Sequence, residues 1–234
     1  MKMKKSVLVV LSGGQDSTTC LHWALSRFEE VHAVTFDYGQ RHRLEVEAAK
    51  EIGKKAGVKS HTLLPLDVLK AIGDSALIEG SQTPLQGEGG RADTAMPQGL
   101  PTSFVPGRNL LFLSAAGALA VKLGCETLVT GVCQTDYSGY PDCREEFIKA
   151  LEVALCLAMP SSSPIRIETP LMHLSKKESV ELAVSLEGCL ESLALSVTCY
   201  NGLRPGCGTC PACVLRAKGF EEAGIPDPQN NLQS

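Results

Sequence analysis

The sequence lacks an excess of positive charge. Its 234 residues include 22 lysines and arginines against 26 aspartates and glutamates, and the formal net charge is −4 at pH 7. Proteins that bind nucleic acid usually carry a basic surface that neutralises backbone phosphates. The composition therefore argues against a nucleic-acid partner and favours a small-molecule substrate.

The sequence also lacks a long apolar run. The stretch at 7–11 is too short for the core of a signal peptide, and the stretch at 110–121 is too short to span a bilayer. We therefore expect a cytoplasmic protein with no membrane partner. Hydrophobic residues make up 44% of the chain and charged residues 21%, which is typical of a soluble protein with a real core.

Ten cysteines are many for a cytosolic enzyme. Without an export signal, disulfides are not the expected explanation. Four of the cysteines lie between Cys199 and Cys213, and this crowding indicates a metal site. The other six are scattered, and we expect them to act as small buried hydrophobic residues.

Apolar strand patterns alternate with helical patterns along most of the chain, which predicts an α/β fold with a doubly wound, parallel, five-stranded sheet. The first strand is a continuous apolar run of the kind that is buried on both faces. The predicted strands are 6–11, 31–36, 60–66, 127–131 and 166–169, and the predicted helices are about 17–28, 41–57, 109–123 and 143–157.

Between 73 and 107 the periodicity disappears, and the stretch is rich in Gly, Pro, Ser and Gln. A long irregular loop inside a compact domain is usually a lid, a binding loop or a disordered segment. We favour a partly mobile lid, because the stretch leads into a predicted helix that carries a motif. The predicted organisation is one large α/β domain at 1–195, a metal-binding element at 196–223 packed on it, and a frayed tail at 224–234.

A glycine-rich turn follows the first predicted strand. The sequence Leu11-Ser12-Gly13-Gly14-Gln15-Asp16-Ser17 lies where a strand turns into a helix, and the unpaired N–H groups at a helix N-terminus favour anions. The two glycines remove Cβ atoms that would hold a phosphate away from the backbone. Ser12 and Ser17 add hydroxyl donors, and Asp16 is expected to hold Mg²⁺ or to order the loop.

Two common phosphate motifs are excluded, because the turn has neither a Gly-Lys-Ser/Thr end nor a third spaced glycine. SGGQDS instead resembles the pyrophosphatase loop (PP-loop) of the synthetases that cleave ATP to adenylate a carbonyl or carboxylate. The resemblance implies an adenine-nucleotide alpha-hydrolase-like fold, Mg-ATP as substrate and cleavage between the α- and β-phosphates. The implied ATP-binding residues are Leu11, Ser12, Gly13, Gly14, Gln15, Asp16, Ser17, Thr18, Thr19, Cys20 and Leu21.

Cys199, Cys207, Cys210 and Cys213 have the spacing C-x₇-C-x₂-C-x₂-C. Four thiolates leave no open coordination position, so a bound zinc ion would be structural, one per chain. Gly208 allows the turn to fold its N–H groups toward sulfur, and the residue after Cys210 is a proline suited to the first position of a helix.

An iron–sulfur cluster is the main alternative for these cysteines, because C-x₂-C-x₂-C also begins a ferredoxin motif. The next ferredoxin cysteine would fall at position 217, which is Ala217 here. The pattern therefore favours zinc over a cluster, with free or redox-active thiols as a third reading. Metal analysis separates them.

Four further blocks resemble one family of PP-loop enzymes, the 7-cyano-7-deazaguanine synthases of queuosine biosynthesis. They are DYGQRH at 37–42, FVPGRN at 104–109, DYSGYPDCR at 136–144 and TCY at 198–200. With the PP-loop and the cysteines, the resemblance covers nearly the whole chain. It departs from the family at Thr198, where a serine is expected, and in the spacing of Cys199 and Cys207, which is one residue shorter than expected.

Most of these blocks lie at or beyond the carboxyl ends of predicted strands, where α/β sheets bind ligands. Tyr137 and Tyr140 can stack on a flat base, and Asp136 or Asp142 can accept hydrogen bonds from a guanine-like N1–H and amino group. Asp142 also suits the N-cap of the predicted helix at 143–157, and that alternative stays open.

Arginines in the same blocks, Arg108 and Arg144, offer planar forks to a carboxylate or to phosphates. Lys176 either assists a phosphate or begins a solvated helix. Cys143 can serve as a nucleophile, although a structural role is favoured. The candidate catalytic residues are Asp16, Ser17, His42, Arg108 and Lys176.

The resemblance implies that 7-carboxy-7-deazaguanine is adenylated, that ammonia displaces AMP to give an amide, and that activation of the amide oxygen followed by elimination gives the nitrile. No glutaminase segment is visible, so free ammonia is the expected nitrogen source. The family also suggests a homodimer.

Two rival functions are weighed against this one. A tRNA-thiolating PP-loop enzyme shares the loop, but the acidic charge and the missing RNA-binding domain argue against it. A zinc-dependent interaction module without catalysis would bind no ATP, so a thermal-shift measurement with Mg-ATP separates it from both enzymes.

Overall fold

The structure is a computed structural model that describes residues 3–40, 43–72, 75, 77–78, 102–134 and 140–233. The described elements, in chain order, are β1 (Met3–Val10), α1 (Gln15–Arg27), β2 (Phe28–Asp37), α2 (Leu44–Ala56), β3 (Ser60–Pro65), α3 (Val68–Ile72), α4 (Arg108–Leu123), β4 (Thr127–Val129), η2 (Pro141–Cys143), α5 (Glu145–Ala158), β5 (Arg166–Glu168), α6 (Lys176–Ser185), α7 (Cys189–Leu193), α8 (Pro211–Ala223) and η3 (Pro228–Gln233).

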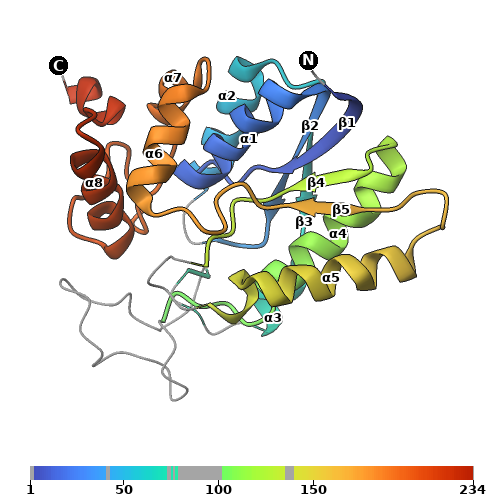
Figure 1. Cartoon of the computed structure of the whole chain (residues 1–234). Helices are drawn as coiled ribbons and strands as arrows, with labels where there is room; N and C mark the ends of the chain where they lie inside the picture. Colours follow the sequence, from blue (N-terminus) through green and yellow to red (C-terminus); the bar gives the residue numbers. More distant parts are fainter. Residues whose placement is uncertain are drawn as a thin grey trace.

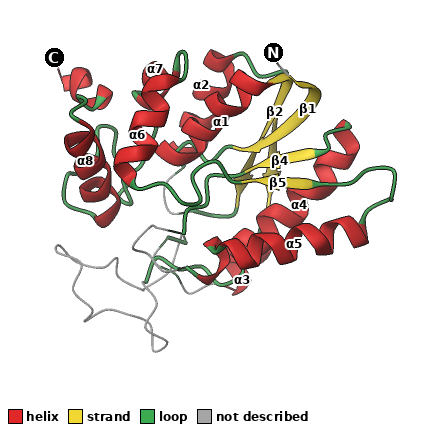
Figure 2. Cartoon of the chain, viewed as in Figure 1, coloured by secondary structure: helices red, strands yellow, loops and turns green. Residues whose placement is uncertain are grey.

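The five strands form one sheet with the order β3-β2-β1-β4-β5, and every neighbouring pair is parallel. The chain runs from β1 outward to β3 and then returns to the other side of β1 with β4. Figures 1 and 2 show the helices lying on both faces of this sheet. The predicted fold class is therefore confirmed, and the strand order reverses between β1 and β4, where α/β sheets place their ligands.

Alternate side chains of β1 enter different hydrophobic cores, because successive residues of a strand point to opposite faces. Val7 and Val9 are fully buried in a cluster with residues of α1 and α2. Leu8 is fully buried in a second cluster with residues of α4 and α5. Burial on both faces explains why this strand reads as an unbroken apolar run in the sequence.

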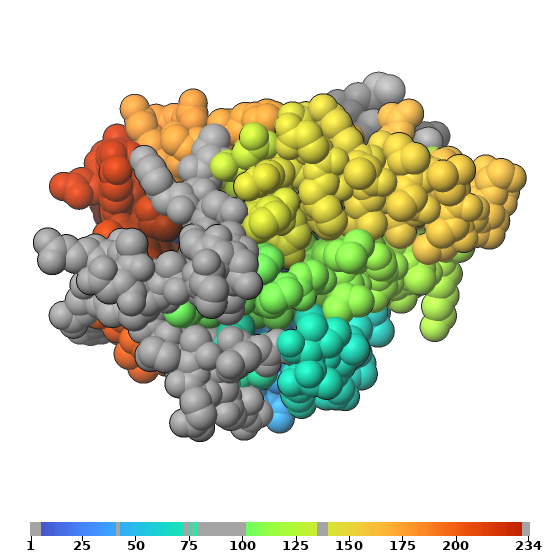
Figure 3. Space-filling model, turned by 90° about the horizontal axis from the view of Figure 1, so that it is seen from below, coloured from blue at the N-terminus to red at the C-terminus, as the bar shows by residue number. Residues whose placement is uncertain are grey.

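The small residues of α4 allow α5 to approach closely. A Cβ atom at Gly117 would lie 2.9 Å from a methyl carbon of Leu155 on α5, so a larger residue would force the two helices apart. Figure 3 shows α5 in yellow beside α4 in green on one face of the molecule. Leu110 of α4 and Val153 and Leu157 of α5 are exposed.

The C-terminal helices form a third cluster beyond α1. Val180 and Ala183 of α6, Leu193 of α7 and Phe220 of α8 are buried together. Helix α8 packs directly on α6, because a Cβ atom at Gly219 would lie 3.0 Å from Cβ of Lys176. Figure 1 shows α8 on the far side of α6 from the sheet.

The segment after Gly224 differs from the sequence prediction of a frayed tail. Asp227 forms an ion pair with the buried Arg216, with a contact of 2.6 Å, and Gln229 is buried and donates to the carbonyl of Ser196. These polar contacts hold the segment as far as Gln229, although its Pro, Asn and Gln content is typical of a loose terminus.

Several short elements were not predicted. Helices α3 and α7 have five residues each, which is too short for a helical period to be recognised in sequence. The predicted boundaries of the long elements agree with the structure to within a few residues. Within the described part of the chain, no helix is long and apolar enough to cross a membrane.

Candidate active site

A cavity of about 320 Å³ lies at the carboxyl ends of β1, β2 and β4. Its wall combines the turn after β1, the ends of β2 and β4, the starts of α2, α4 and α6, and one side of α8. The polar side chains in this wall are Ser12, Gln15, Asp16, Ser17, Tyr38, Gln40, Glu45, Arg108, Asn109, Thr130, Cys133, Tyr140, Cys143, Lys176, Thr198, Tyr200 and Arg216.

The turn between β1 and α1 is ordered by its own serines. The hydroxyl of Ser17 lies 3.0 Å from that of Ser12 and donates to the carbonyl of Gly14 at 3.1 Å. It also accepts the backbone N–H of Ser12 at 3.1 Å. The loop therefore closes on the first turn of α1, with Gly14 as its N-cap and the helix N-terminus at the cavity wall.

The two glycines have different reasons for being glycine. Gly13 has φ +88°, and a Cβ atom there would lie 2.3 Å from the carbonyl oxygen of Glu45 and 2.9 Å from the nitrogen of Ala49. It therefore permits a close approach to α2 and does not line the cavity. Gly14 does line the cavity, and a Cβ atom there would meet nothing closer than 3.6 Å. The sequence-based reason, access for a phosphate, applies to Gly14 alone.

The second half of the predicted ATP-binding segment is buried inside α1. Thr18, Thr19, Cys20 and Leu21 have at most 1% of their surface exposed and do not line the cavity. The hydroxyl of Thr18 donates to the carbonyl of Gly14 at 2.8 Å, and that of Thr19 donates to Gln15 at 3.1 Å. These two hydrogen bonds stabilise the first turn of α1 from within the protein core. Direct contact with a nucleotide stays a prediction for Leu11, Ser12, Gly14, Gln15, Asp16 and Ser17, which do line the cavity.

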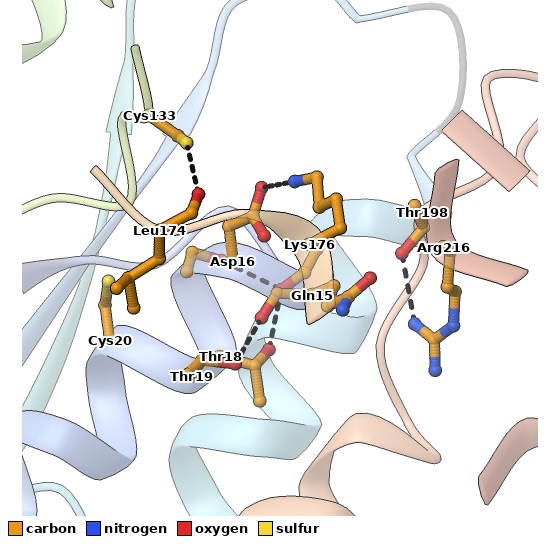
Figure 4. Close-up of polar contacts among 12 residues, drawn as sticks. Gln15, Asp16, Thr18, Thr19, Cys20, Cys133, Leu174, Lys176, Thr198 and Arg216 are labelled. Carbon is orange, nitrogen blue, oxygen red and sulfur yellow. Dashed lines mark hydrogen bonds and ion pairs between the residues drawn. The ribbon is translucent and has the colours of Figure 1, made fainter. Parts of the chain in front are cut away.

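Asp16 and Lys176 meet at the cavity wall. The Nζ of Lys176 lies 2.8 Å from Oδ2 of Asp16, and only 17% of the lysine side chain is exposed. Figure 4 shows this ion pair above the first turn of α1. The other carboxylate oxygen of Asp16 is buried and has no hydrogen-bond partner among the described residues. An unsatisfied carboxylate oxygen beside an anion site fits a Mg²⁺ ligand, because Mg²⁺ prefers carboxylate and phosphate oxygens.

A second charged group lies near the start of α4. Arg108 begins this helix and lines the cavity together with Glu45 and Tyr38. Burial raises the pKa of Glu45 to about 7, although the charge of Arg108 opposes this rise. Burial also raises the pKa of Tyr38. Burial alone would lower the pKa of Arg108, but its neighbours Tyr38 and Tyr140 raise it, so the guanidinium stays charged.

The residues of the sequence YPDCR, at 140–144, lie partly in the cavity wall and partly behind it. Tyr140 and Cys143 line the cavity, and the Tyr140 hydroxyl lies 2.6 Å from the Ser103 hydroxyl. Asp142 is buried outside the cavity wall, where its carboxylate accepts the backbone N–H of Asn109 at 3.0 Å. Asp142 thus caps the N-terminus of α4, not that of α5 as the capping alternative proposed.

Three predicted site residues, His42, Asp136 and Tyr137, lie outside the described residues, as does most of the predicted lid. Arg144 is exposed at the N-cap of α5 and does not line the cavity. Among the described residues of the predicted substrate pocket, the structure therefore brings only Tyr140 and Arg108 together with the phosphate loop.

The four clustered cysteines converge on one point. Their sulfur atoms all lie within 4.8 Å of one another, which suits a single metal ion held by Cys199, Cys207, Cys210 and Cys213. Backbone N–H groups of Cys207 and Cys210 donate to sulfur at 3.4 and 3.3 Å. Gly208 has φ +74°, as the predicted turn requires, and Pro211 begins α8. The hydrogen bond between the side chains of Cys210 and Cys213 lowers the pKa of Cys210 and raises that of Cys213.

The cysteine cluster is joined to the cavity through the segment that precedes Cys199. The N–H of Val197 donates to the carbonyl of Gly13 at 2.8 Å. On either side of Val197, the guanidinium of Arg216 donates to the hydroxyls of Ser196 at 2.8 Å and Thr198 at 3.1 Å. Figure 4 shows Arg216 and Thr198 on the side of the phosphate loop opposite Cys133. The C-terminal segment that carries the cysteines thus forms part of the cavity wall.

The scattered cysteines mostly follow the prediction. Cys20, Cys125, Cys133 and Cys189 are buried, as expected for small hydrophobic residues. Cys156 is exposed on α5 and does not fit that expectation, and Cys143 is half-buried at the cavity.

The profile of the family described as "Queuosine biosynthesis protein QueC" matches residues 6–224. The chain belongs to this family. A 7-cyano-7-deazaguanine synthase of Chromobacterium violaceum is 59% identical over 226 residues, covering 96% of this chain and 92% of the relative. Proteins of the same name from Laribacter hongkongensis and Lysinibacillus sphaericus are 56% and 51% identical, covering 96% and 95% of this chain and 93% and 96% of the relatives.

Among solved structures, a predicted subunit of a tRNA methyltransferase from Methanocaldococcus jannaschii is similar, with a TM-score of 0.47 and 20% identity over 77% of this chain and 74% of that chain.

Sequence reasoning missed several residues of this QueC-family cavity. Glu45 appeared only as part of a polar helix, and Arg216 as part of the helix after the cysteines, because neither lies in a recognisable motif. Gly131 was identified only as a strand end. A Cβ atom at Gly131 would lie 3.0 Å from the backbone carbonyl carbon of Asp16, so this glycine lets β4 approach the phosphate loop. Its position after a parallel strand was the one available signal.

Proposed function

We propose that this chain converts 7-carboxy-7-deazaguanine, Mg-ATP and ammonia into 7-cyano-7-deazaguanine. The observation that carries the proposal is one cavity that joins a PP-loop at a helix N-terminus to a half-buried arginine, Arg108, in a chain that is 51–59% identical to synthases of that name. The enzyme is an ATP-dependent ligase that forms a carbon–nitrogen bond.

On the phosphate side, the N-terminus of α1 would hold the triphosphate. The free N–H groups of the first turn and the hydroxyl of Ser12 would donate to phosphate oxygens. The unsatisfied oxygen of Asp16 would ligate the Mg²⁺ that accompanies ATP, while Lys176 holds the carboxylate in place and adds positive charge next to the leaving pyrophosphate.

On the substrate side, Arg108 would hold the carboxylate of the deazaguanine base through a planar fork. This grip orients one carboxylate oxygen toward the α-phosphorus of ATP. Transfer of AMP from ATP to that oxygen makes AMP the leaving group at the acyl carbon. Ammonia then displaces AMP to form the amide. ATP then adenylates the amide oxygen and releases a second pyrophosphate. The C–O bond to this AMP breaks, and the loss of AMP together with two N–H protons gives the nitrile. Tyr140, held by Ser103, would contact the flat base.

The four cysteines would hold a structural zinc ion. The ligand set fits, because four sulfur atoms surround one point and backbone N–H groups satisfy them from outside. When bound, zinc supplies binding energy that orders the segment from Cys199 to Cys213 and leaves no open position for substrate. The residues that act on the substrate are those of the cavity.

The decisive experiment is mass spectrometry of products from 7-carboxy-7-deazaguanine, Mg-ATP and ammonium. We expect the nitrile, with AMP and pyrophosphate released. Asp16→Ala combined with Ser12→Ala should reduce the rate of nitrile formation by at least about 100-fold. Lys177→Ala, beside Lys176 but exposed, is the matched control and should leave it unchanged. A normal rate in the double variant would refute the assignment of the loop.

We also propose a cytoplasmic homodimer, with residues 1–195 as the synthetase domain and 196–223 as the metal-binding element. The exposed apolar side chains of α4 and α5 support self-association, since Leu157 is 83% exposed and Val153 59% exposed. Light scattering of the wild type and of a Leu157→Glu variant tests this; a monomeric wild type would contradict it.

A further inference from the structure

Two carboxylates belong to the described residues of the cavity wall, Asp16 and Glu45. Asp16 is already engaged with Lys176 beside the phosphate loop. Glu45 lies in the first turn of α2, on the side of the cavity that also carries Arg108 and Tyr38. A half-buried carboxylate costs desolvation energy, so its place in this wall requires an explanation that the phosphate loop does not provide.

Glu45 is held rigidly with respect to the phosphate loop. The backbone carbonyl oxygen of Glu45 lies against Gly13, and a Cβ atom built on Gly13 would be only 2.3 Å from this oxygen. The next turn of α2 continues this contact through the nitrogen of Ala49, 2.9 Å from the same position. The loop that would carry the triphosphate and the backbone that carries the Glu45 carboxylate are therefore in direct contact.

The reaction in this cavity has an unmet chemical requirement. In neutral water ammonia is mostly the ammonium ion, which has no lone pair and cannot attack an acyl carbon. The site must attract this cation and remove one proton from it beside the adenylated carboxylate. A carboxylate can do both, because it attracts a cation when ionised and then accepts the proton.

We propose that Glu45 binds ammonium and is the general base of the nitrogen-transfer step, an inference that rests on the proposed function above. One N–H bond of ammonium breaks and its proton passes to a Glu45 carboxylate oxygen. The freed lone pair forms a C–N bond at the acyl carbon, the C–O bond to AMP breaks, and AMP leaves with that electron pair. The proton on the new amide nitrogen then passes to solvent.

The surroundings of Glu45 suit the role of a general base. Burial raises its pKa to about 7, and the charge of Arg108 opposes but does not cancel that rise. A base with a pKa near the working pH is both ionised and basic enough to take a proton. Arg108 and Tyr38 are the described ionisable groups that act electrostatically on Glu45. Arg108, which would hold the substrate carboxylate, therefore lies near the base that would deliver the nucleophile.

The test separates the two halves of the reaction. In Glu45→Gln, exchange of labelled pyrophosphate into ATP, measured with 7-carboxy-7-deazaguanine and without ammonium, should stay within about threefold of wild type, whereas ammonium-dependent amide formation should fall by at least about 100-fold. Glu47→Gln is the matched control on the same helix, because the Glu47 side chain is 59% exposed and pairs with Lys50; it should leave both rates unchanged.

A nucleophile that needs no deprotonation gives a sharper result. Hydroxylamine is largely uncharged at neutral pH, so its hydroxamate product should form at similar rates in wild type and Glu45→Gln. Equal loss with hydroxylamine and ammonium would show that Glu45 only supports the structure, and would overturn the proposal. Glu45→Asp keeps a carboxylate and should recover part of the ammonium-dependent rate; no recovery would count against it.

The pH profile gives an independent reading. If wild type uses ammonium, its rate at fixed total ammonium should level off above the pKa of the base. Residual activity of Glu45→Gln should keep rising about tenfold per pH unit, since it depends on free ammonia alone. A wild-type rate that rises in the same way would refute the role of Glu45. By contrast, an absence of pyrophosphate exchange in the wild type would refute the proposed function itself.

Discussion

The N–H of Val197 donates to the carbonyl of Gly13 across 2.8 Å. Gly13 lies in the phosphate loop, and Val197 is two residues before the first cysteine of the metal cluster. The same glycine packs on the start of α2. The loop is therefore fixed from one side by α2 and from the other by the C-terminal element, although more than 180 residues of sequence separate Gly13 from Val197.

Removal of the metal should weaken nucleotide binding as well as stability. A chelator, or Cys210→Ser, is expected to release the segment from Cys199 to Cys213 and with it the bond between Val197 and Gly13. Loss of one such hydrogen bond, worth about 1 kcal/mol, predicts a Kd for ATP raised about fivefold. Calorimetric titration with ATP measures this change.

In the chelator experiment, added zinc should restore the Kd of wild type but not that of Cys210→Ser. An apo protein that binds ATP with the wild-type Kd would show that the metal element has no influence on the loop.

Gly13→Ala and Gly14→Ala should fail in different ways. The first places a Cβ atom 2.3 Å from a backbone oxygen at φ +88°, and we expect a loss of several kcal/mol, about 3 or more, in the free energy of unfolding. The second meets only ordinary contacts and should cost about 1 kcal/mol or less.

Because Gly14 lines the cavity, however, Gly14→Ala should raise the KM for ATP. Urea denaturation of both variants, with steady-state kinetics of the second, checks the pair of predictions. Equal stability of the two variants would contradict the separate roles assigned to the two glycines.

The ion pair between Arg216 and Asp227 should be a large contributor to stability. Arg216 is only 4% exposed, and its removal by Arg216→Met leaves a largely buried carboxylate and several unpaired polar atoms. Breaking a buried pair in this way typically costs about 3–5 kcal/mol. Denaturant unfolding measures the loss.

The matched control for Arg216→Met is Lys218→Met on the same helix, whose partner Glu222 is exposed. It should change the free energy of unfolding by about 0.5 kcal/mol or less. Similar losses in both variants would argue against a special role for the buried pair.

His22 should contribute to a loss of stability as the pH drops below about 6.5, together with His32 and His61, whose pKa values burial also lowers. Burial lowers the pKa of His22 below its usual value of 6.5, and its ring nitrogens contact the carbonyl of Glu187 and the hydroxyl of Ser192. Below pH 6.5 the unfolded chain binds a proton that the folded chain does not, so the folded state loses stability until the pH reaches the folded pKa.

His22→Gln should therefore reduce the pH dependence of the denaturation midpoint between roughly pH 5 and 7, which is the range in which a histidine changes its charge. His173→Gln, at a histidine that is 66% exposed, should not change that dependence. Identical slopes in wild type and His22→Gln would remove His22 as the cause.

Local sequence patterns were sufficient to predict those features that depend on a single strand, turn or short segment. The apolar run at 6–11 predicted a central strand, the SGG turn predicted a helix N-terminus at the site, and the spacing of four cysteines predicted their convergence. Each of these features depends on neighbours within about twenty residues, so the sequence displays it directly.

The same patterns could not assign Asp142 or Arg144, because the partner of Asp142 is the N-terminus of a helix 33 residues away, and the exposure of Arg144 depends on how α5 packs. They also missed the ordered segment after Gly224, whose contacts with Arg216 and Ser196 leave no local periodicity.

The sequence by itself determined the class of fold, the glycine-rich loop before the first helix and the four cysteines that converge, since these follow from residue order and spacing. Only the tertiary structure decided that Glu45 and Arg108 share a cavity with that loop, and that the element carrying the cysteines forms part of the cavity wall. The physical reason is that residues far apart in sequence meet through the packing of whole helices and strands, and that packing is a property of the entire chain.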